Sequence, residues 1–260
     1  MPVAVLIPAY NEAATIAEIV GRARRQVDRV IVVDDGSRDE TAARAEAAGA
    51  VVLRQADNQG KGAGLWRGMR HALEQGATAV ITLDADGQHH PEDIPKLLVA
   101  HRRCPGRLIV AARLSHRDRA PGVRRFANGM ADFWVSWAAG YPLRDTQSGF
   151  RLYPAEFLRQ ASPPEPGRRG FVYESSLLIQ AARCGCYPAA VAIETLYLAQ
   201  GRPSHYRPWR DTSRIIELVA GSLIKRGMYP SGLLRSLRLL PLAVNPDEVL
   251  IKQHDSENKP

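Results

Sequence analysis

Apolar and polar positions follow two different periods along the first half of the chain, and these periods predict strands and helices in turn. Short apolar runs rich in β-branched residues are typical of strands that are buried on both faces of a parallel sheet. Such runs occur at residues 3–7, 29–33, 50–53, 78–83 and 107–112. Between them, apolar residues recur at helical spacing, as Ile16, Ile19 and Ala23 do within residues 12–25. The alternation predicts an α/β fold with a mostly parallel central sheet sandwiched by helices.

The remaining helices and strands are predicted from the same periods and from their end signals. Ser37 followed by Glu40 has the spacing of a capping box and predicts a helix that ends before Gly49. Further helices are predicted at 62–75, 90–101, 128–139, 172–183, 212–226 and 233–242, and further strands at 150–153 and 187–196. The last helices combine apolar stripes with basic residues, and the tail from Asn245 is polar. We therefore expect a catalytic domain over residues 1–210 and an amphipathic helical extension over 211–260.

Three polar clusters follow predicted strands, at the points where those strands end. They are P-A-Y-N-E at residues 8–12, D-D-G-S at 34–37 and D-A-D-G-Q at 84–88. Ligands of open α/β sheets bind in the crevice outside the carboxyl ends of the strands. The three clusters are therefore expected to face one pocket.

The third cluster has the composition of a divalent-metal site. In an extended stretch, side chains two residues apart point the same way, so Asp84, Asp86 and Gln88 are expected to converge. All three offer oxygen, which suits Mg²⁺ or Mn²⁺ held by one or two carboxylates together with substrate phosphates. A solvated acidic turn is the alternative interpretation of the same residues.

Other residues at this edge suit a nucleotide. Tyr10 can stack on a flat base, and a carboxylate from Glu12 or Asp35 can accept hydrogen bonds from a base or a ribose. The loop N-Q-G-K-G-A-G at residues 58–64 lacks the spacing of a P-loop, but its glycines permit close backbone approach beside Asp35, and it carries Lys61. Core packing and an ordinary flexible turn are the alternatives.

The second half adds candidates for catalysis and for acceptor binding. Arg113 ends the strand after the acidic run, where a diphosphate could meet it. In D-T-Q-S-G-F-R, Asp145 could orient or deprotonate an acceptor and Arg151 could hold a phosphate bidentately. Glu174 could contact the sugar, although a carboxylate at a helix start has a simpler explanation in the helix dipole.

Composition excludes some classes of protein. The apolar fraction of 45% and the charged fraction of 24% are ordinary for a globular chain, and 35 Lys and Arg against 27 Asp and Glu give a net charge of +8. No nucleic-acid-binding signature accompanies that charge, so nucleic acid is not an expected partner. The three cysteines form no zinc or disulfide pattern. We expect no secretory signal and no membrane-spanning helix, and hence a cytoplasmic protein.

With P-A-Y-N-E, V-V-D-D-G-S-R-D-E-T, N-Q-G-K-G, D-A-D-G-Q-H-H-P-E and D-T-Q-S-G-F-R in this order, the chain resembles family 2 glycosyltransferases of the GT-A fold. Within that family it is similar to the dolichyl-phosphate and polyprenyl-phosphate mannosyltransferase branch. The resemblance implies nucleoside contacts from Pro8, Tyr10, Glu12, Val33 and Asp35. It implies contacts to metal and diphosphate from Asp84, Ala85, Asp86 and Gln88, and it assigns functional arginines to Arg113 and Arg151.

The chain departs from that branch further on. Where the branch carries R-x-x-G-x-S-K, this sequence has A-Q-G-R-P-S-H, so Arg202 and His205 are the candidate acceptor-binding residues there. The expected function is metal-dependent, inverting transfer of a sugar from a UDP- or GDP-sugar to a polyprenyl phosphate, with Asp86, Asp145 and Arg151 in catalytic roles. A hydroxyl acceptor, a sugar-phosphate nucleotidyltransferase and a non-catalytic module that binds nucleotide-sugar or lipid remain alternatives. The basic C-terminal helices are expected to lie on the anionic inner membrane surface or to pack on protein.

Overall fold

A seven-stranded sheet forms the centre of the protein in this computed structural model, which describes residues 2–113, 122–163, 172–193 and 208–246. The strands are β1 (Val3–Ala9), β2 (Arg29–Asp34), β3 (Val51–Arg54), β4 (Ala79–Thr82), β5 (Ile109–Ala112), β6 (Arg151–Pro154) and β7 (Ala189–Ala192). Their order in the sheet is β3-β2-β1-β4-β6-β5-β7, and every pairing except those of β6 is parallel. The predicted mostly parallel sheet is confirmed.

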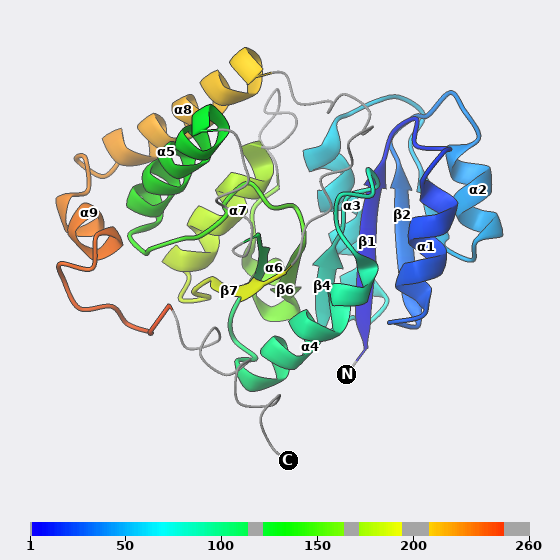
Figure 1. The fold of residues 1–260 in the computed structure, drawn as a ribbon, viewed down its shortest axis with the longest axis horizontal. Coiled ribbons are helices and arrows are strands. Elements are labelled where there is room, and N and C mark those ends of the chain that lie inside the picture. Colours follow the sequence, from blue (N-terminus) through cyan, green and yellow to red (C-terminus); the bar gives the residue numbers. More distant parts are fainter. Residues whose placement is uncertain (1, 114–121, 164–171, 194–207, 247–260) are drawn as a thin grey trace.

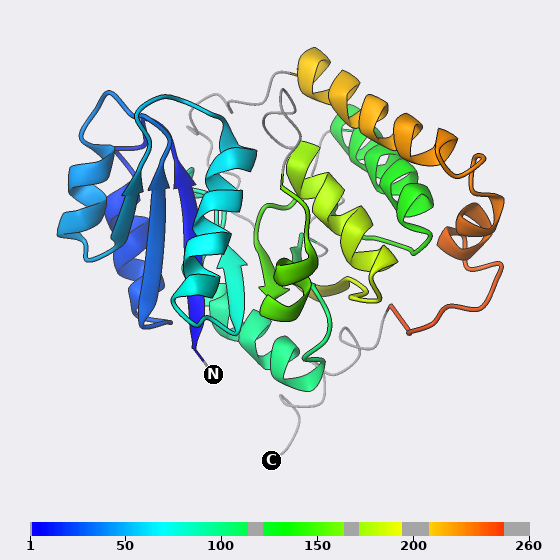
Figure 2. The same cartoon turned by 180° about the vertical axis from the view of Figure 1, so that it is seen from behind.

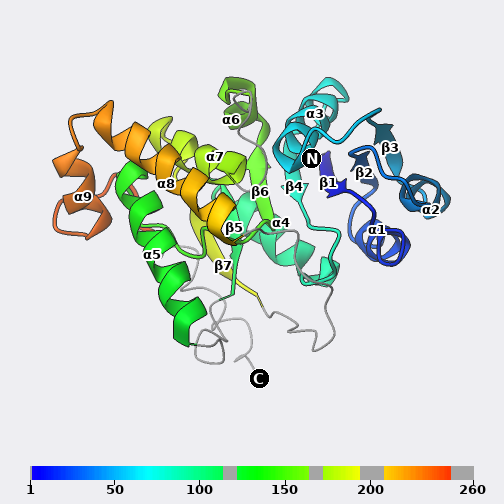
Figure 3. The same ribbon diagram turned by 90° about the horizontal axis from the view of Figure 1, so that it is seen from above.

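Helices cover both faces of the sheet (Figures 1 and 2). They are α1 (Ile16–Arg24), α2 (Thr41–Ala47), α3 (Lys61–Glu74), α4 (Ile94–Arg103), α5 (Gly122–Ala139), α6 (Ala155–Gln160), α7 (Val172–Arg183), α8 (Pro208–Ile224) and α9 (Pro230–Ser236), with a 3-10 turn, η1, at Pro91–Asp93. Figure 3 shows α1 and α4 on one side of the strands and α3, α6 and α7 on the other. Each face therefore has its own apolar core.

The central strands alternate their side chains between these two cores. Leu6 of β1 packs in the core beneath α3 and α7, whereas Val5 and Ile7 pack in the core beneath α1 and α4. All three side chains are fully buried. Burial on both faces explains why the parallel strands are continuous apolar runs instead of alternating ones.

Strand β6 runs against its neighbours, and this direction was not predicted. Ala79 pairs with Pro154 and Thr82 pairs with Arg151, so the amino end of β6 lies beside the carboxyl end of β4. A parallel strand of this length would begin about 13 Å away, at the opposite edge of the sheet. The reversal brings the D-T-Q-S-G-F-R segment to the same edge as the acidic run after β4.

Several predicted elements need correction. Ser37 does not cap α2, which begins at Thr41 without a side-chain cap, because Ser37 is engaged with the loop after β1. Helix α9 ends at Ser236 and does not reach residue 242, and Arg238 beyond it has a positive φ of 61°. The last strand is shorter than predicted, the short helix α6 was not predicted, and α5 begins six residues before the predicted start at 128.

The C-terminal helices pack on the rest of the protein. Helix α8 contacts α7 and α5, and α9 contacts α5. Tyr229 sits at the turn between α8 and α9 in a left-handed conformation, and its ring lies where a Cβ on Gly140 or Gly232 would collide with it. Trp137 Nε1 of α5 donates to the carbonyls of Met228 and Tyr229 at 3.1 and 3.2 Å. The boundary near residue 210 stays a prediction, and α8 crosses it.

The chain after α9 returns to the sheet. Arg107, just before β5, is buried and donates hydrogen bonds to the carbonyls of Tyr187, Pro188 and Asn245 and to the Tyr141 hydroxyl. These contacts tie the segment that follows α9 to β7 and to the end of α5. Across the described ranges, no helix has both the length and the apolar character needed to cross a membrane.

Candidate active site

The loops after β1 and β2 are joined by four hydrogen bonds between backbone and side chain. Asn11 N–H donates to Ser37 Oγ at 2.9 Å, and Arg38 N–H donates back to Asn11 Oδ1 at 2.9 Å. Glu12 N–H donates to Thr41 Oγ1, and Ala13 N–H to Asp39 Oδ2. Asn11 adopts a positive φ of 56°, which asparagine tolerates better than most residues. The two predicted nucleoside-binding loops therefore form one structure.

These bonds also place the residues predicted for the nucleoside. Pro8 and Val33 are register partners on β1 and β2, and Val33 is fully buried, so any contact with a ligand would use its main chain. Tyr10 and Glu12 follow Pro8 and are half-buried. A role at the site was not predicted from the sequence for Asn11, Ser37 or Thr41. Each of them lies inside one of the two motifs P-A-Y-N-E and V-V-D-D-G-S-R-D-E-T, which could have indicated such a role.

Asp35 holds the glycine-rich loop. It is buried, and its carboxylate accepts hydrogen bonds from Gln59 N–H and Gly60 N–H at 2.7 Å each and from Gln55 Nε2 at 2.8 Å. This brings the loop beside Asp35, as expected. However, those oxygens are engaged with protein donors, so the carboxylate orders the loop in this structure rather than offering free acceptors to a base.

The acidic run after β4 is a turn, not the extended stretch that was predicted. The strand ends at Thr82, residues 85–87 turn, and Gly87 has a φ of 75°. Asp86 is exposed and its Oδ1 accepts Gln88 N–H at 3.0 Å, while Asp84 is half-buried. A turn with glycine at its left-handed position therefore sets how Asp84, Asp86 and Gln88 lie, and the predicted strand alternation does not apply to them.

Lys61 connects this turn to α3 and α7. Its Nζ lies 2.6 Å from Asp84 Oδ1 and 3.1 Å from Glu174 Oε2. Burial alone would lower the pKa of Lys61, but the charges of Asp84 and Glu174 outweigh burial and raise it. Burial would likewise raise the pKa of Asp84, and Lys61 and His89 lower it below its ordinary value. Lys61 is thus an ammonium ion bridging two carboxylates from different elements.

The site suits a divalent cation. Partial loss of solvation and then the nearby charge of Asp84 raise the pKa of Asp86, although part of its side chain faces solvent. Lys61 pairs with Asp84 and Glu174, and Asp86 lies on the same turn as Asp84. Within the described part of the chain, no three His, Cys, Asp or Glu side chains are arranged to hold a metal by themselves. Asp84 and Asp86 would hold Mg²⁺ or Mn²⁺ only together with other oxygens, as phosphates provide.

Arg113, Asp145 and Asp132 form a buried chain of hydrogen bonds. Arg113 donates from Nε and Nη2 to the two oxygens of Asp145, at 2.8 and 2.6 Å, and its N–H also donates to Asp145. Burial would raise the pKa of Asp145, but Arg113 lowers it. Asp132 of α5 in turn accepts the N–H groups of Asp145 and Thr146. Asp145 is therefore placed to orient Arg113, and it is a weak base in this arrangement.

Arg151 is fully buried and its donors are used within the protein. The guanidinium donates to the carbonyls of Ser148, Glu174 and Thr146 at 2.7, 2.8 and 2.8 Å. The expected bidentate contact with an acceptor phosphate is not supported, because the side chain is committed to shaping the loop before β6.

Asp132 was missed as a positioning residue, although an aspartate among the aromatic residues of an amphipathic helix was a usable signal.

Two predicted acceptor residues, Arg202 and His205, lie outside the described residues. Ala85 is buried, and its carbonyl accepts the Thr15 hydroxyl at 2.7 Å, which ties the acidic turn to the start of α1.

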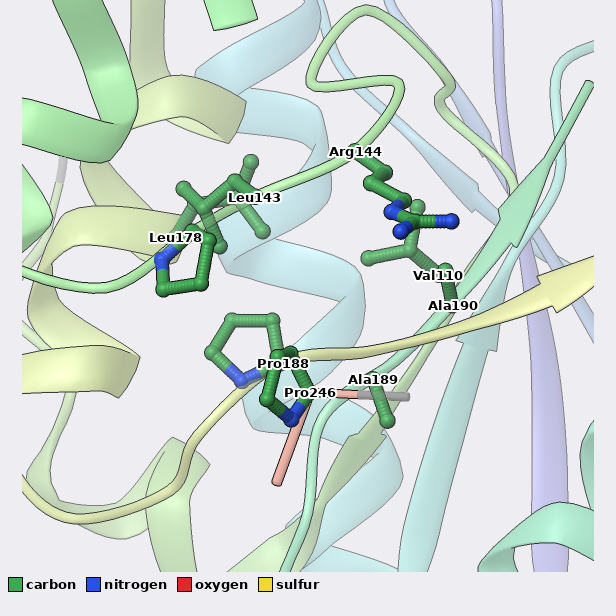
Figure 4. A pocket seen from close by; sticks show the side chains of 9 residues that line it. Val110, Leu143, Arg144, Leu178, Pro188, Ala189, Ala190 and Pro246 are labelled. Carbon is green, nitrogen blue, oxygen red and sulfur yellow. The ribbon is translucent and has the colours of Figure 1, made fainter. Parts of the chain in front are cut away.

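A hollow beside Val110, Arg144 and Pro246 has a volume of only about 10 Å³ (Figure 4). It holds no more than a water molecule and is not a substrate site.

Comparisons with known proteins show the family of the chain. The sequence profile described as "Glycosyl transferase family 2" matches residues 4–153. The chain belongs to glycosyl transferase family 2. This confirms the resemblance drawn from the motifs and the prediction that the chain is a glycosyltransferase.

Relatives in family 2 include enzymes named for lipid-phosphate acceptors. The undecaprenyl-phosphate mannosyltransferase of Micrococcus luteus is 32% identical over 200 residues, covering 71% of this chain and 79% of that protein. The UDP-N-acetylglucosamine–dolichyl-phosphate N-acetylglucosaminyltransferase of Methanococcus voltae is 28% identical over 215 residues, covering 74% and 84%.

A solved structure supports the GT-A fold. Glucosyl-3-phosphoglycerate synthase of Mycobacterium tuberculosis, crystallised with Mn²⁺, uridine diphosphate and glucosyl-3-phosphoglycerate, matches with a TM-score of 0.62 at 25% identity. The match covers 88% of this chain and 81% of that one. The predicted fold class is thereby confirmed.

Proposed function

We propose that this family 2 glycosyltransferase moves a sugar from a UDP- or GDP-sugar to a polyprenyl phosphate. The observation that carries the proposal is the cluster of Asp84, Asp86 and Lys61 at the carboxyl edge of the sheet, beside the loop that Asp35 orders. This edge combines carboxylates for a cation with an ammonium group for a diphosphate. The names of the lipid-phosphate relatives support the acceptor class.

In the proposed reaction, an oxygen of the lipid phosphate forms a bond to the anomeric carbon. On the opposite face of that carbon, the bond to the diphosphate breaks and the nucleoside diphosphate leaves with the electron pair, so the anomeric centre is inverted. A divalent cation, when bound by Asp84 and Asp86, neutralises charge on the leaving diphosphate. Lys61 supplies a further positive charge there, and the joined loops after β1 and β2 hold the nucleoside.

The state of Asp145 favours a phosphate acceptor over a hydroxyl acceptor. A hydroxyl group must lose a proton as it attacks, whereas a phosphate is already anionic at neutral pH. Asp145 is paired with Arg113, which lowers its pKa. Because a carboxylate of this kind is a poor proton acceptor, a reaction that needs no strong base fits the site better.

The hydrocarbon part of the acceptor has a candidate place between α7 and α8. A cavity of about 310 Å³ lies there, with Val172, Ile179 and Leu218 among its apolar walls. Two polar groups at its wall are hydrogen-bonded within the protein: Ser176 Oγ donates to the Tyr173 carbonyl, and Gln180 Oε1 accepts Ser162 N–H. The lining is part apolar and part polar, and its apolar part suits a prenyl chain.

One end of this cavity is near the acidic cluster. Tyr173, which lines the cavity, precedes Glu174 and packs its Cβ against Gly62, the neighbour of Lys61. The other end reaches Arg183 and Lys225. A lipid chain lying along the cavity would therefore connect the site to the basic C-terminal helices.

A panel assay tests the proposed function. The protein is incubated with UDP- and GDP-sugars, a polyprenyl phosphate and Mg²⁺ or Mn²⁺, and nucleoside diphosphate release and glycolipid formation are measured. The Asp86→Asn variant, which loses a charge at an exposed position, is expected to lose at least about 100-fold in turnover with little change in melting temperature. Full activity of that variant would contradict the assignment.

The same assay separates the alternatives. A sugar-phosphate nucleotidyltransferase would consume a nucleoside triphosphate and release pyrophosphate. A hydroxyl acceptor would be glycosylated in place of the lipid phosphate. A non-catalytic module would bind nucleotide-sugar, as measured by calorimetry, without forming any product.

A further inference from the structure

An ammonium group belonging to the protein occupies the carboxylate that is proposed to bind the metal. Lys61 Nζ lies 2.6 Å from Asp84 Oδ1, well within the range of a charge-assisted contact. The Lys61 and Asp84 side chains are only 19% and 21% exposed, so water screens this pair weakly. A divalent cation approaching Asp84 must therefore compete with Lys61.

Two groups of the protein lie against the Asp84 carboxylate, Gly149 and Lys61. The main chain of Gly149 covers the Asp84 carboxylate so closely that a Cβ there would lie 2.5 Å from Oδ2 and 3.0 Å from Oδ1. Lys61 takes Oδ1. A metal ion that coordinates this oxygen must therefore displace the ammonium group.

Glu174 provides Lys61 with a second partner away from the turn. Its Oε2 lies 3.1 Å from Lys61 Nζ, and its side chain is 5% exposed. Lysine is a compact charge on a flexible four-carbon stem, so its ammonium group can leave one carboxylate while it stays close to another. Glu174 is thus placed to keep Lys61 in the site after Asp84 releases it.

We propose that Lys61 is a built-in cation that holds Asp84 until the donor arrives, and that it then moves to the donor diphosphate while the metal ion takes its place on Asp84. Glu174 is the positioning residue that retains Lys61 during this exchange. The inference rests on the proposed function for the identity of the donor. It implies that metal ion and nucleoside diphosphate bind cooperatively, each making the site better for the other.

Metal affinity in the absence of turnover tests this exchange. Mn²⁺ binding is measured by the loss of the free-ion EPR signal, without nucleotide and with UDP or GDP, for the wild type and for Lys61→Met. The variant is expected to bind Mn²⁺ about 10-fold more tightly without nucleotide, and to show a smaller gain on adding nucleotide than the wild type.

Two further variants separate this exchange from an effect of net charge and from misfolding. Lys61→Met with Glu174→Gln removes both charges of a buried pair, so its net charge equals that of the wild type, and it is also expected to bind Mn²⁺ more tightly without nucleotide. Lys96→Met removes a lysine of α4 that pairs with Asp93 of η1, and it is expected to behave like the wild type. Thermal melting confirms that each variant is folded.

The outcomes are distinct. Equal Mn²⁺ affinity of the wild type and the folded double variant without nucleotide would overturn the exchange by Lys61. Tighter binding by Lys96→Met of the same size as by Lys61→Met would reduce the effect to net charge and would also overturn it. If neither the wild type nor any variant bound Mn²⁺ even with UDP or GDP, the proposed metal dependence would be wrong. This inference would then fail as well.

Discussion

Because Gly149 has no side chain, the Asp84 carboxylate can lie close to its main chain. A Cβ at this position would lie 2.5 Å from Asp84 Oδ2, closer than such atoms approach. Since the rest of the residue is main chain held between β6 and Thr82, whose hydroxyl donates to the Gly149 carbonyl at 2.7 Å, the carboxylate would have to move instead. The site therefore depends on glycine at this position for geometry.

Gly149→Ala is accordingly expected to reduce kcat/KM by about 10-fold or more, because a misplaced carboxylate no longer meets the donor correctly. Gly64→Ala on α3 is the matched control, since its Cβ would meet Val33 at an ordinary 3.6 Å. Steady-state kinetics on both variants checks the prediction. Equal activity of the two variants would show that Asp84 tolerates displacement.

His89 is expected to make the folded state sensitive to acid. It is buried with its ring 5.5 Å from that of Phe150, and burial lowers its pKa from 6.5 to about 4. Between these values the unfolded chain binds a proton that the folded chain does not, so stability falls as the pH drops from 6.5 to 4. The full effect is on the order of 3 kcal/mol.

His89→Gln removes this titration. The advantage of the wild type over the variant in free energy of unfolding, measured by urea denaturation in the absence of metal, is expected to shrink steadily between pH 6.5 and 4. Above pH 7 the difference should be constant. A difference that stays the same across the whole range would show that His89 is protonated equally in both states.

At the scale of helices and strands, periodicity predicted position well and direction poorly. The runs at β1, β2 and β4 are apolar because both faces are buried, and α7 matches its prediction of 172–183 because its apolar spacing and its charged ends agree. The antiparallel direction of β6 depends on how its neighbours are connected, which no local pattern records. The acidic turn was mistaken for an extended stretch because Gly87 was not weighed as a left-handed residue.

For the candidate site, too, the sequence predicted some features well and others poorly. The motifs indicated which segments meet, and the structure brings them to one edge of the sheet. They did not indicate that Asp35, Asp145 and Arg151 would be engaged by protein groups, because partners such as Gly60 N–H or the Glu174 carbonyl are main-chain atoms that any residue supplies. Side-chain identity alone cannot distinguish a residue that contacts ligand from one that holds a loop.

The cavity between α7 and α8 yields a prediction about acceptor length. Leu218→Trp places a larger side chain in its wall and is expected to lower activity with a long polyprenyl phosphate about 5-fold, while activity with a short one such as farnesyl phosphate changes little. Val51→Trp is the control, at a position of the edge strand β3 that is 49% exposed and lies at the other end of the molecule. Equal losses with both acceptors would place the chain elsewhere.

On the scale of the whole molecule, most of the exposed large apolar side chains of the described residues lie at one end. Helices α5, α8 and α9 lie together at the end of the molecule opposite β3 (Figure 3). Exposed large apolar residues on these helices and the chain just after them are Met130, Trp134, Ile216, Ile224, Met228, Leu234, Leu237, Leu239 and Leu240. Exposed basic residues of the same region are Lys225, Arg226, Arg235 and Arg238. We propose that this end lies on an anionic membrane surface, where the lipid acceptor is found.

Replacing Ile216 and Ile224 together by serine is expected to weaken binding to vesicles containing anionic lipid by about 10-fold, since both side chains are more than half exposed and would lose apolar contact with the bilayer. Val51→Ser, on the edge strand β3 at the other end, is the control and is 49% exposed in the wild type. Co-sedimentation measures the bound fraction, which should also fall with added salt. Identical binding by both variants would indicate that these helices do not touch the membrane.

The hydrogen bonds that link the loops after β1 and β2 have a kinetic consequence. Hydrogen bonds of Asn11, Ser37 and Thr41 order these loops before a nucleotide binds. The loops therefore lose less conformational entropy on binding than flexible loops would. A rigid receptor of this sort can capture the activated sugar from solution before any lipid is present. The sugar nucleotide should then bind before the lipid phosphate, and the protein should reach the bilayer with the sugar nucleotide already bound.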